Sequence, residues 1–297
     1  MSYEFLLQLI VNGIVVGLIY GLIATGLALL FGILHIVNFA HGEMVMLAMY
    51  AMAVVVPLLG GSYMASFAII VIAAALLGWL VSGGLLAALS SKPGQMAIFE
   101  KSLLLTLGLS IILLNGVQYI FTATPMMVTT DIPTGAFTFG TVRLSYGHAI
   151  AGAIAIVIFA GLYLFLTRSN SGRALRAVAQ NREAALMIGL DPEKVARRAI
   201  TLSIVLCAVG GAVLIPLYVF QPIVGQALLL KAFAIVIIGG MGNVLGAAVV
   251  ALGLGVLESV VGGFANIVWQ NAIAFLGMIL VLLIRPQGLF ALAMRKG

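Results

Sequence analysis

Few side chains in this sequence could carry out acid–base or metal chemistry, and those that could are scattered. Glu43, Lys231 and Glu258 stand inside long apolar runs, where an ionisable group is a candidate functional residue. Two of these residues could instead have no functional role. Lys231 could extend its ammonium group to the membrane surface, and Glu258 could lie at the end of its helix near that surface. His35 and His41 lie near Glu43, but one half-polar turn without a second cluster is weak evidence for a metal site. We expect neither a metal nor a cofactor.

Motifs of nucleotide hydrolysis and of catalysis within membranes are missing from the sequence. It contains no G-x-x-x-x-G-K-[ST], no G-x-S-x-G and no H-E-x-x-H. The first motif cradles phosphates and the other two supply a nucleophile or zinc ligands. We therefore expect no catalytic residue and no ATPase site of this type.

The only long polar segment is residues 168–198, with the sequence RSNSGRALRAVAQNREAALMIGLDPEKVARR. It holds seven cations and three anions, and so contributes +4 to the formal net charge of +6. A short loop of this sign between membrane spans is expected on the cytoplasmic side. The sequence pI of about 9.7 does not indicate a nucleic-acid partner, because the cations cluster beside spans.

A short helix with defined ends is predicted inside this loop. The Asn181 side chain can accept a hydrogen bond from a free backbone N–H at the helix start, and Gly189 can take the left-handed conformation that ends the helix. Asp191 can cap the next helix, with Pro192 in its first position. Two turns of helix are marginal in water, so we expect another subunit to pack against them. The residues that present a small, partly apolar surface are Ala184, Ala185, Met187 and Ile188.

The composition indicates an all-α polytopic membrane protein. Hydrophobic residues make up 64% and charged residues 7% of the chain, with a mean hydropathy of +1.28, whereas a soluble domain has about 25% charged residues. A span needs about 20 mostly apolar residues. We therefore predict a single transmembrane domain over residues 1–297, with roughly eight to ten transmembrane or half-spanning helices.

The distribution of cations predicts the topology. Lys92 and Lys101 place the connection after the third apolar segment on the same side as residues 168–198, and Arg285, Arg295 and Lys296 place the C-terminus there. Residues 122–146 should then face the periplasm, and their Thr, Gly and β-branched residues predict a short extended excursion. The segment 227–238 is too short for an upright span, so we expect it to tilt or to form a half-helix. The apolar segments are residues 5–31, 44–59, 65–89, 102–121, 148–166, 199–220, 227–238, 245–261 and 267–284.

Gly, Asn and His interrupt the apolar runs in both halves of the chain. The first break is GILHIVNFAHG at residues 32–42, and the second is GGMGNVLG at residues 239–246. Irregular backbone at membrane depth is tolerated only where protein or a water-filled cavity satisfies it. Breaks in both halves indicate a transport path and an inverted repeat; the alternative is two surface turns. The path residues on the first interpretation are Asn38, His41, Glu43, Gly239, Gly240 and Asn243.

The loop also carries a family resemblance. Glu183-Ala184-Ala185, three residues and Gly189 resemble the E-A-A-x-x-x-G core of the coupling loop in permease subunits of bacterial ATP-binding-cassette importers, although the apolar-Leu-Pro tail of that motif is absent. The longer run GRALRAVAQNREAALMIGLDPEKV is similar to LivH-type permeases for branched-chain amino acids. So are NFAHGEM at residues 38–44, KAFAIVIIGGMGNVLGA at 231–247 and RPQG at 285–288. The resemblance covers nearly the whole chain.

This resemblance implies a role in an importer of the bacterial inner membrane. It implies leucine, isoleucine and valine as cargo, delivered by a periplasmic amino-acid-binding protein. It also implies two separate ATPase subunits and a paralogous second permease as partners, with membrane lipid around them. The residues it places in coupling to the ATPase are Asn181, Glu183, Ala184, Ala185, Met187, Gly189 and Asp191.

A secondary transporter or channel driven by an ion gradient is the alternative function. It would need carboxylates or cation ligands within the membrane, and the sequence supplies few. Proton-dependent uptake without ATPase partners would favour it.

Overall fold

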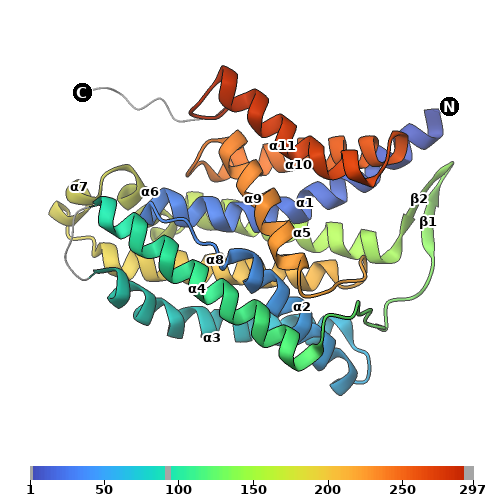
Figure 1. Ribbon diagram of the computed structural model, residues 1–297, viewed down its shortest axis with the longest axis horizontal. Coiled ribbons are helices and arrows are strands. Elements are labelled where there is room, and N and C mark those ends of the chain that lie inside the picture. Colours follow the sequence, from blue (N-terminus) through green and yellow to red (C-terminus); the bar gives the residue numbers. More distant parts are fainter. Residues whose placement is uncertain (1–2, 91–94, 291–297) are drawn as a thin grey trace.

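The computed structural model describes residues 3–90 and 95–290 (Figure 1). Lys92, Arg295 and Lys296, which support the predicted topology, lie outside these residues. The described elements are α1 (Tyr3–Leu34), α2 (His41–Leu58), α3 (Tyr63–Ser90), α4 (Gln95–Phe121), β1 (Ala136–Phe139), β2 (Val142–Ser145), α5 (Tyr146–Arg168), α6 (Asn170–Gln180), α7 (Arg182–Met187), α8 (Pro192–Leu214), α9 (Val224–Gly239), α10 (Val244–Phe264) and α11 (Ile267–Ile284).

The predicted all-α polytopic membrane fold is confirmed. Seven helices among the described residues are long and apolar enough to span a membrane: α1, α2, α3, α4, α5, α8 and α10. Two shorter apolar helices, α9 and α11, join them, which agrees with the predicted range. The short segment expected at residues 227–238 is α9, whose 16 residues rise only about 24 Å at 1.5 Å per residue.

The bundle has two distinct ends. α6 and α7 lie at one end, called here the loop end, and the β1–β2 hairpin lies at the other, called the hairpin end (Figure 1). The hairpin confirms the extended excursion predicted within residues 122–146; its strands are antiparallel, with Phe139 opposite Val142, and Gly140 takes a positive φ of 62° in the turn.

α1 fixes the side of the N-terminus, which the cation distribution left open. Near its start, the Gln8 side chain donates to the carbonyl oxygen of Arg143 in β2 and accepts from the backbone N–H of the same residue, both at 2.7 Å. Near its end, Leu29 and Ile33 pack with α6. The helix therefore runs from the hairpin end to the loop end, and the N-terminus lies at the hairpin end.

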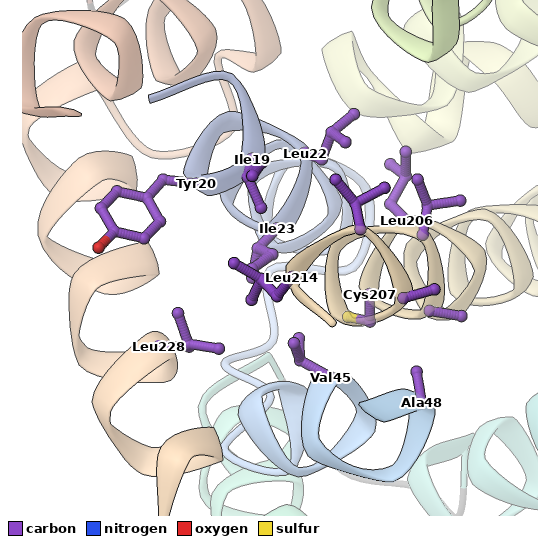
Figure 2. Close-up of a cluster of buried hydrophobic side chains, with 14 of the residues drawn as sticks. Ile19, Tyr20, Leu22, Ile23, Val45, Ala48, Leu206, Cys207, Leu214 and Leu228 are labelled. Atoms are coloured by element: carbon purple, nitrogen blue, oxygen red, sulfur yellow. The ribbon is translucent and has the colours of Figure 1, made fainter. Parts of the chain in front are cut away.

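The core forms where α1, α2, α8 and α9 meet. Figure 2 shows Val45 and Ala48 of α2 facing Cys207 of α8, with Leu228 of α9 beside them. The single cysteine is fully buried, which fits the packing role that an apolar run favours. α10 lies close against α1, because a Cβ built on Gly13 would come within 2.6 Å of the Cα of Val256; small residues permit such close helix contacts in membranes.

Candidate functional site

α6 attaches the polar loop to the bundle. The Ser169 hydroxyl accepts from the backbone N–H of Gly172 at 2.9 Å and caps the helix. The apolar face of α6, with Leu175 and Val178, packs against Leu29 of α1 and Val195 of α8 in a second, smaller core cluster. Residues 168–180 were expected only as part of a charged loop, although the spacing of Ala174, Leu175 and Val178 is that of an amphipathic helix.

α7 has the two ends that the sequence predicted. The Asn181 side chain accepts from the backbone N–H of Ala184 at 2.9 Å, and Gly189 takes a φ of 81°. Asp191 then caps α8, accepting from the backbone N–H groups of Glu193 at 3.0 Å and Lys194 at 3.3 Å. The hydrogen bond from the Lys194 backbone is the main reason that the pKa of the exposed Asp191 carboxyl is lowered. These caps hold six residues of helix between fixed stops.

The surface of α7 differs in part from the expected one. Ala185 points inward and is buried in the second cluster, so it anchors the helix and presents no surface to a partner. Ala184 and Glu183 are exposed, and the Met187 side chain is 91% exposed. Leu186 and Ile188 are exposed beside it. Three adjacent apolar side chains at the tip of an otherwise charged loop form a small surface suited to a protein partner.

The first break returns into the bundle and is not a surface turn. After α1 ends, residues 35–40 run back along α4, where the backbone N–H of Phe39 donates to the Thr106 hydroxyl at 3.1 Å. The Thr106 hydroxyl donates to the carbonyl of Ser102 at 2.8 Å and lies 3.3 Å from the carbonyl oxygen of Val37. α2 then begins at His41, whose ring Nε2 lies 2.8 Å from the carbonyl oxygen of Ile23, near the middle of α1. The irregular backbone is thus satisfied by protein, as membrane depth requires.

The N-terminal ends of α2 and α9 are in contact next to the first break. Gly42 of α2 and Gly225 of α9 touch through their backbones, and a Cβ on Gly225 would lie 2.8 Å from the carbonyl oxygen of Gly42. α2 runs from there toward the hairpin end, where Tyr63 donates its backbone N–H to Asp131 at 2.9 Å. α9 runs to the loop end. Two helices that start at a common point and run in opposite directions are the arrangement expected of an inverted repeat.

Glu43 is the buried carboxyl group at this junction. It is fully buried in the first turn of α2. Ser110 of α4 faces it, but neither carboxyl oxygen has a hydrogen bond that meets distance and angle criteria within the described part of the chain. The Asn38 side chain, in contrast, accepts a hydrogen bond from the backbone N–H of Ala40 at 3.0 Å. The His41 ring contacts the carbonyl oxygen of Ile23 and lies 3.3 Å from the Cys207 sulfur. Because a buried, unpaired polar group is costly, Glu43 is the strongest functional candidate of the first break.

The second break is a tight turn at the loop end. Gly240 takes a φ of 95°, and the Asn243 side chain caps α10, accepting from the backbone N–H of Gly246 at 2.9 Å. The same side chain donates to the carbonyl of Phe290 at 2.6 Å. Gly288 lies against this turn, where its Cβ would come within 2.6 Å of the Gly240 Cα. Asn243 is therefore engaged in structure, and a large side chain at Gly240 would strain the turn.

The start of the first break contacts the second break near the loop end of the bundle. A Cβ on Gly32 would lie 3.0 Å from the carbonyl oxygen of Gly242. Next to this contact is a cavity of about 130 Å³, lined by Ile36 and Val37 of the first break, Met241 of the second, and apolar residues of α1 and α9. Gly239 is buried in the same turn. The cavity has the apolar lining of a site for an aliphatic group.

Lys231 and Glu258 form a buried ion pair, a contact that was not predicted from the sequence. The Lys231 ammonium lies 2.7 Å from Glu258 Oε2 and donates to the Tyr20 hydroxyl at 2.9 Å. The Tyr20 hydroxyl donates to the same carboxyl oxygen at 3.2 Å. Side-chain exposure is 13% for Lys231 and 1% for Glu258, so Lys231 does not reach the membrane surface. This triad ties α1, α9 and α10 together.

Residues 215–223 are a third interruption of the apolar helices, in addition to the two predicted breaks. They connect α8 to α9, and Phe220 is buried there, with its backbone paired to Met126 (N–H to carbonyl distances of 2.8 and 3.0 Å). The signal in the sequence was Pro216 and the Gln221-Pro222 pair within an apolar run, because proline ends helices and lacks a backbone donor.

Comparisons with known proteins show the family of this chain. The family model described as "Branched-chain amino acid transport system / permease component" matches residues 9–283. The high-affinity branched-chain amino acid transport system permease protein BraD of Pseudomonas aeruginosa is 31% identical, over 97% of this chain and 96% of that protein. The corresponding LivH of Salmonella typhimurium is 28% identical over 97% of both chains. A probable LivH of Methanocaldococcus jannaschii is 26% identical, over 93% of this chain and 89% of that protein.

Among solved structures, PsaBC from Streptococcus pneumoniae in complex with Fab aligns over 96% of this chain and 94% of that chain, with a TM-score of 0.48 and 17% identity. This likeness is too weak to support an assignment. The match to the family model extends over nearly the full length of the chain, and with it the resemblance to LivH-type permeases is confirmed. The chain belongs to the family of permease components of branched-chain amino acid transport systems.

Proposed function

We propose that this chain is the transmembrane permease subunit of an ATP-binding-cassette importer that carries leucine, isoleucine and valine. Its membership of the permease family supports the class, and the names of its relatives support the cargo. In this proposal residues 1–297 act as one permease domain. The chain contains no phosphate-binding loop of the G-x-x-x-x-G-K-[ST] type, so two separate ATPase subunits supply the energy and a periplasmic protein delivers the amino acid. A paralogous permease completes the pathway.

The observation that carries the proposal is the capped helix α7. A helix of six residues is not stable by itself, yet Asn181, Gly189 and Asp191 fix both of its ends. Buried Ala185 fixes its position on the bundle. The rigid loop then holds Met187 outward, almost fully exposed. We infer that this tip enters a groove on the ATPase and transmits its closure to α6, α1 and α8.

The proposed orientation puts the loop end in the cytoplasm. The cations of residues 168–198 and Arg285 all belong to this end, which agrees with the positive-inside rule. The hairpin end and the N-terminus then face the periplasm, where the delivery protein docks. The membrane is the bacterial inner membrane in this proposal, because both delivery from the periplasm and ATP from the cytoplasm are needed.

We further propose that the path passes Glu43 and the cavity between the two breaks. The unpaired Glu43 carboxyl at mid-depth offers a weak partner to the ammonium group of an amino acid. The apolar cavity beside Ile36 and Met241 accepts its aliphatic side chain during passage. His41, Asn38 and Asn243 hold the irregular backbone in place through the hydrogen bonds described above.

The test combines a variant at the tip of α7 with a matched control. Met187→Asp places a charge on the proposed contact, whereas Gln180→Asp places the same charge on an exposed residue at the end of α6. Because burying a methionine side chain is worth about 1.5–3 kcal/mol, the Met187 variant should bind the ATPase subunits about 10- to 100-fold more weakly. Both variants should fold, since both side chains are exposed.

The measurement is copurification of the ATPase subunits, together with ATP-driven uptake of leucine in vesicles that contain the complete transporter. We expect binding and uptake to fall for Met187→Asp and to stay near wild type for Gln180→Asp. Full ATPase binding by Met187→Asp would disprove the coupling role. Uptake that needs a proton gradient and no ATPase partner would instead establish the secondary transporter.

A further inference from the structure

A second cavity, of about 910 Å³, lies between α3, α5 and α8 at the loop end. Its outer part is lined by Lys194, Arg197 and Arg198 at the start of α8. Its inner part is lined by Trp79 of α3 and by Leu202 and Val205 of α8. Along α8 the lining extends from Asp191 to Val205, which is about 21 Å at 1.5 Å per residue. The cavity is thus elongated, with a cationic end and an apolar end.

At the cationic end, the exposed guanidinium of Arg197 has no acceptor among the described residues. Arg197 reaches across to α3, where a Cβ built on Gly83 would lie 3.1 Å from its Nη2 atom; the glycine leaves room for the guanidinium. No hydrogen bond or ion pair to this guanidinium occurs within residues 3–90 and 95–290. Arg198 is held beside it, because its Nη1 donates to the Ser171 hydroxyl at 3.1 Å.

The acidic residues at the cavity leave a net positive charge. The Asp191 carboxyl is already used, since it caps α8 and pairs with Lys194 at 3.3 Å. Glu193 is exposed and remains as one negative charge against the two arginines. A planar guanidinium without a partner beside a second one is suited to binding phosphate oxygens.

The apolar end of the cavity lies beside exposed apolar side chains of α3. Trp79 is 58% exposed, and Leu76 and Leu80, on the same helix, are more exposed still. Side chains of this kind on the outside of a membrane bundle face lipid. A free phosphate would occupy only the arginine end of a cavity this large. An ATPase subunit at the loop end, outside the membrane, would not reach the level of Val205, well inside the span of α8.

We propose that this cavity binds one anionic phospholipid, with its phosphate on Arg197 and Arg198 and its acyl chains against Trp79, Leu202 and Val205. Basic pockets between membrane helices recognise lipid head groups in this way. The site is separate from Glu43 and from the tip of α7, so it goes beyond the transport function proposed above. It lies between α3 and α8, with Phe165 of α5 and Ser171 of α6 in its lining, so a bound lipid joins the loop end of α3 to the helix that follows the polar loop.

The test uses the full-length chain, purified in mild detergent, stripped of lipid and titrated with single phospholipids in native mass spectrometry. We expect wild type to retain one phosphatidylglycerol with at least tenfold preference over phosphatidylcholine. Arg197→Gln should lose about tenfold in affinity for phosphatidylglycerol, because one charged hydrogen-bonding group is removed. Arg197→Lys should lose less, since it keeps the charge. Arg176→Gln on α6 is the matched control: Arg176 is exposed at the same end of the bundle but lies outside the cavity, and we expect no change.

Three results would overturn the proposal. The first is equal retention of the two lipids by wild type, and the second is an equal loss of phosphatidylglycerol in the Arg197 and Arg176 variants. The third is displacement of the lipid by inorganic phosphate or by added ATPase subunits, which would assign the cavity to a free anion or to a protein. If Arg197→Gln does not fold, the same change at the neighbouring Arg198 serves the same comparison; both arginines are exposed.

Discussion

Removing Lys231 should destabilise the protein because it leaves the Glu258 carboxylate buried without its cation. The two groups are 2.7 Å apart and Glu258 is 1% exposed, so water cannot replace the lost partner. Breaking a buried ion pair on one side costs about 3–5 kcal/mol. For Lys231→Met we expect the lower end, about 3 kcal/mol, because the Tyr20 hydroxyl still donates to Glu258. This corresponds to a folding equilibrium shifted on the order of a hundredfold.

The double variant Lys231→Met with Glu258→Gln should recover most of this loss. The uncharged amide keeps an oxygen for Tyr20 and leaves no buried charge, and replacing both members of a buried pair is often close to neutral. Leu230→Met is the control on the same helix, because Leu230 is half exposed. Unfolding in mixed micelles with increasing sodium dodecyl sulfate, followed by tryptophan fluorescence, gives the free energies, and leucine uptake is measured in parallel.

Two outcomes would refute this reasoning. If Lys231→Met lowers the free energy of unfolding by less than about 1 kcal/mol, the ion pair contributes no more than a solvent-exposed pair does. A double variant as unstable as the sum of its single changes would mean that the two residues act independently. A stable double variant that no longer transports would show that the charges serve the transport cycle and not only the joining of α1, α9 and α10.

Three further outcomes follow from the structure. In a Cys207→Ala background, which removes a fully buried thiol, cysteines placed at exposed Thr129 and exposed Gln180 should react with an impermeant maleimide from opposite faces of the membrane; labelling of both from one face would overturn the topology. The lowered pKa of Asp191 means that its cap stabilises the folded state while ionised, so wild-type stability should fall as the pH drops below the ordinary carboxyl value of 3.8. Asp191→Asn should lack this fall, and a parallel decline in both proteins would exclude the cap as its source. Glu43→Gln should slow uptake without changing which amino acid is preferred, since the delivery protein selects the cargo; wild-type rates in reconstituted vesicles would remove Glu43 from the path.

The sequence alone was sufficient for features that depend on residues close together in the chain. The caps of α7 and α8 connect atoms two or three residues apart, and Gly189 ends α7 through its own backbone angle. Such local rules can be read from residue type and order. The membrane class and the apolar helices were also predictable, because burial in lipid requires long apolar runs whatever the packing.

Only the tertiary structure decided which residues meet. Lys231 reaches Glu258 across 27 residues and Tyr20 across 211 residues, and no periodicity in the chain encodes such pairings. The tertiary structure also decides that Ala185 is buried, because the packing of α6 on the bundle sets which face of α7 contacts it. The first break returns to the middle of α1 while the second remains at the loop end, although both look alike as Gly-rich interruptions. The sequence indicates that the backbone of each break needs hydrogen-bond partners. Which groups provide them, and where in the bundle the break lies, depends on the helices that pack around it.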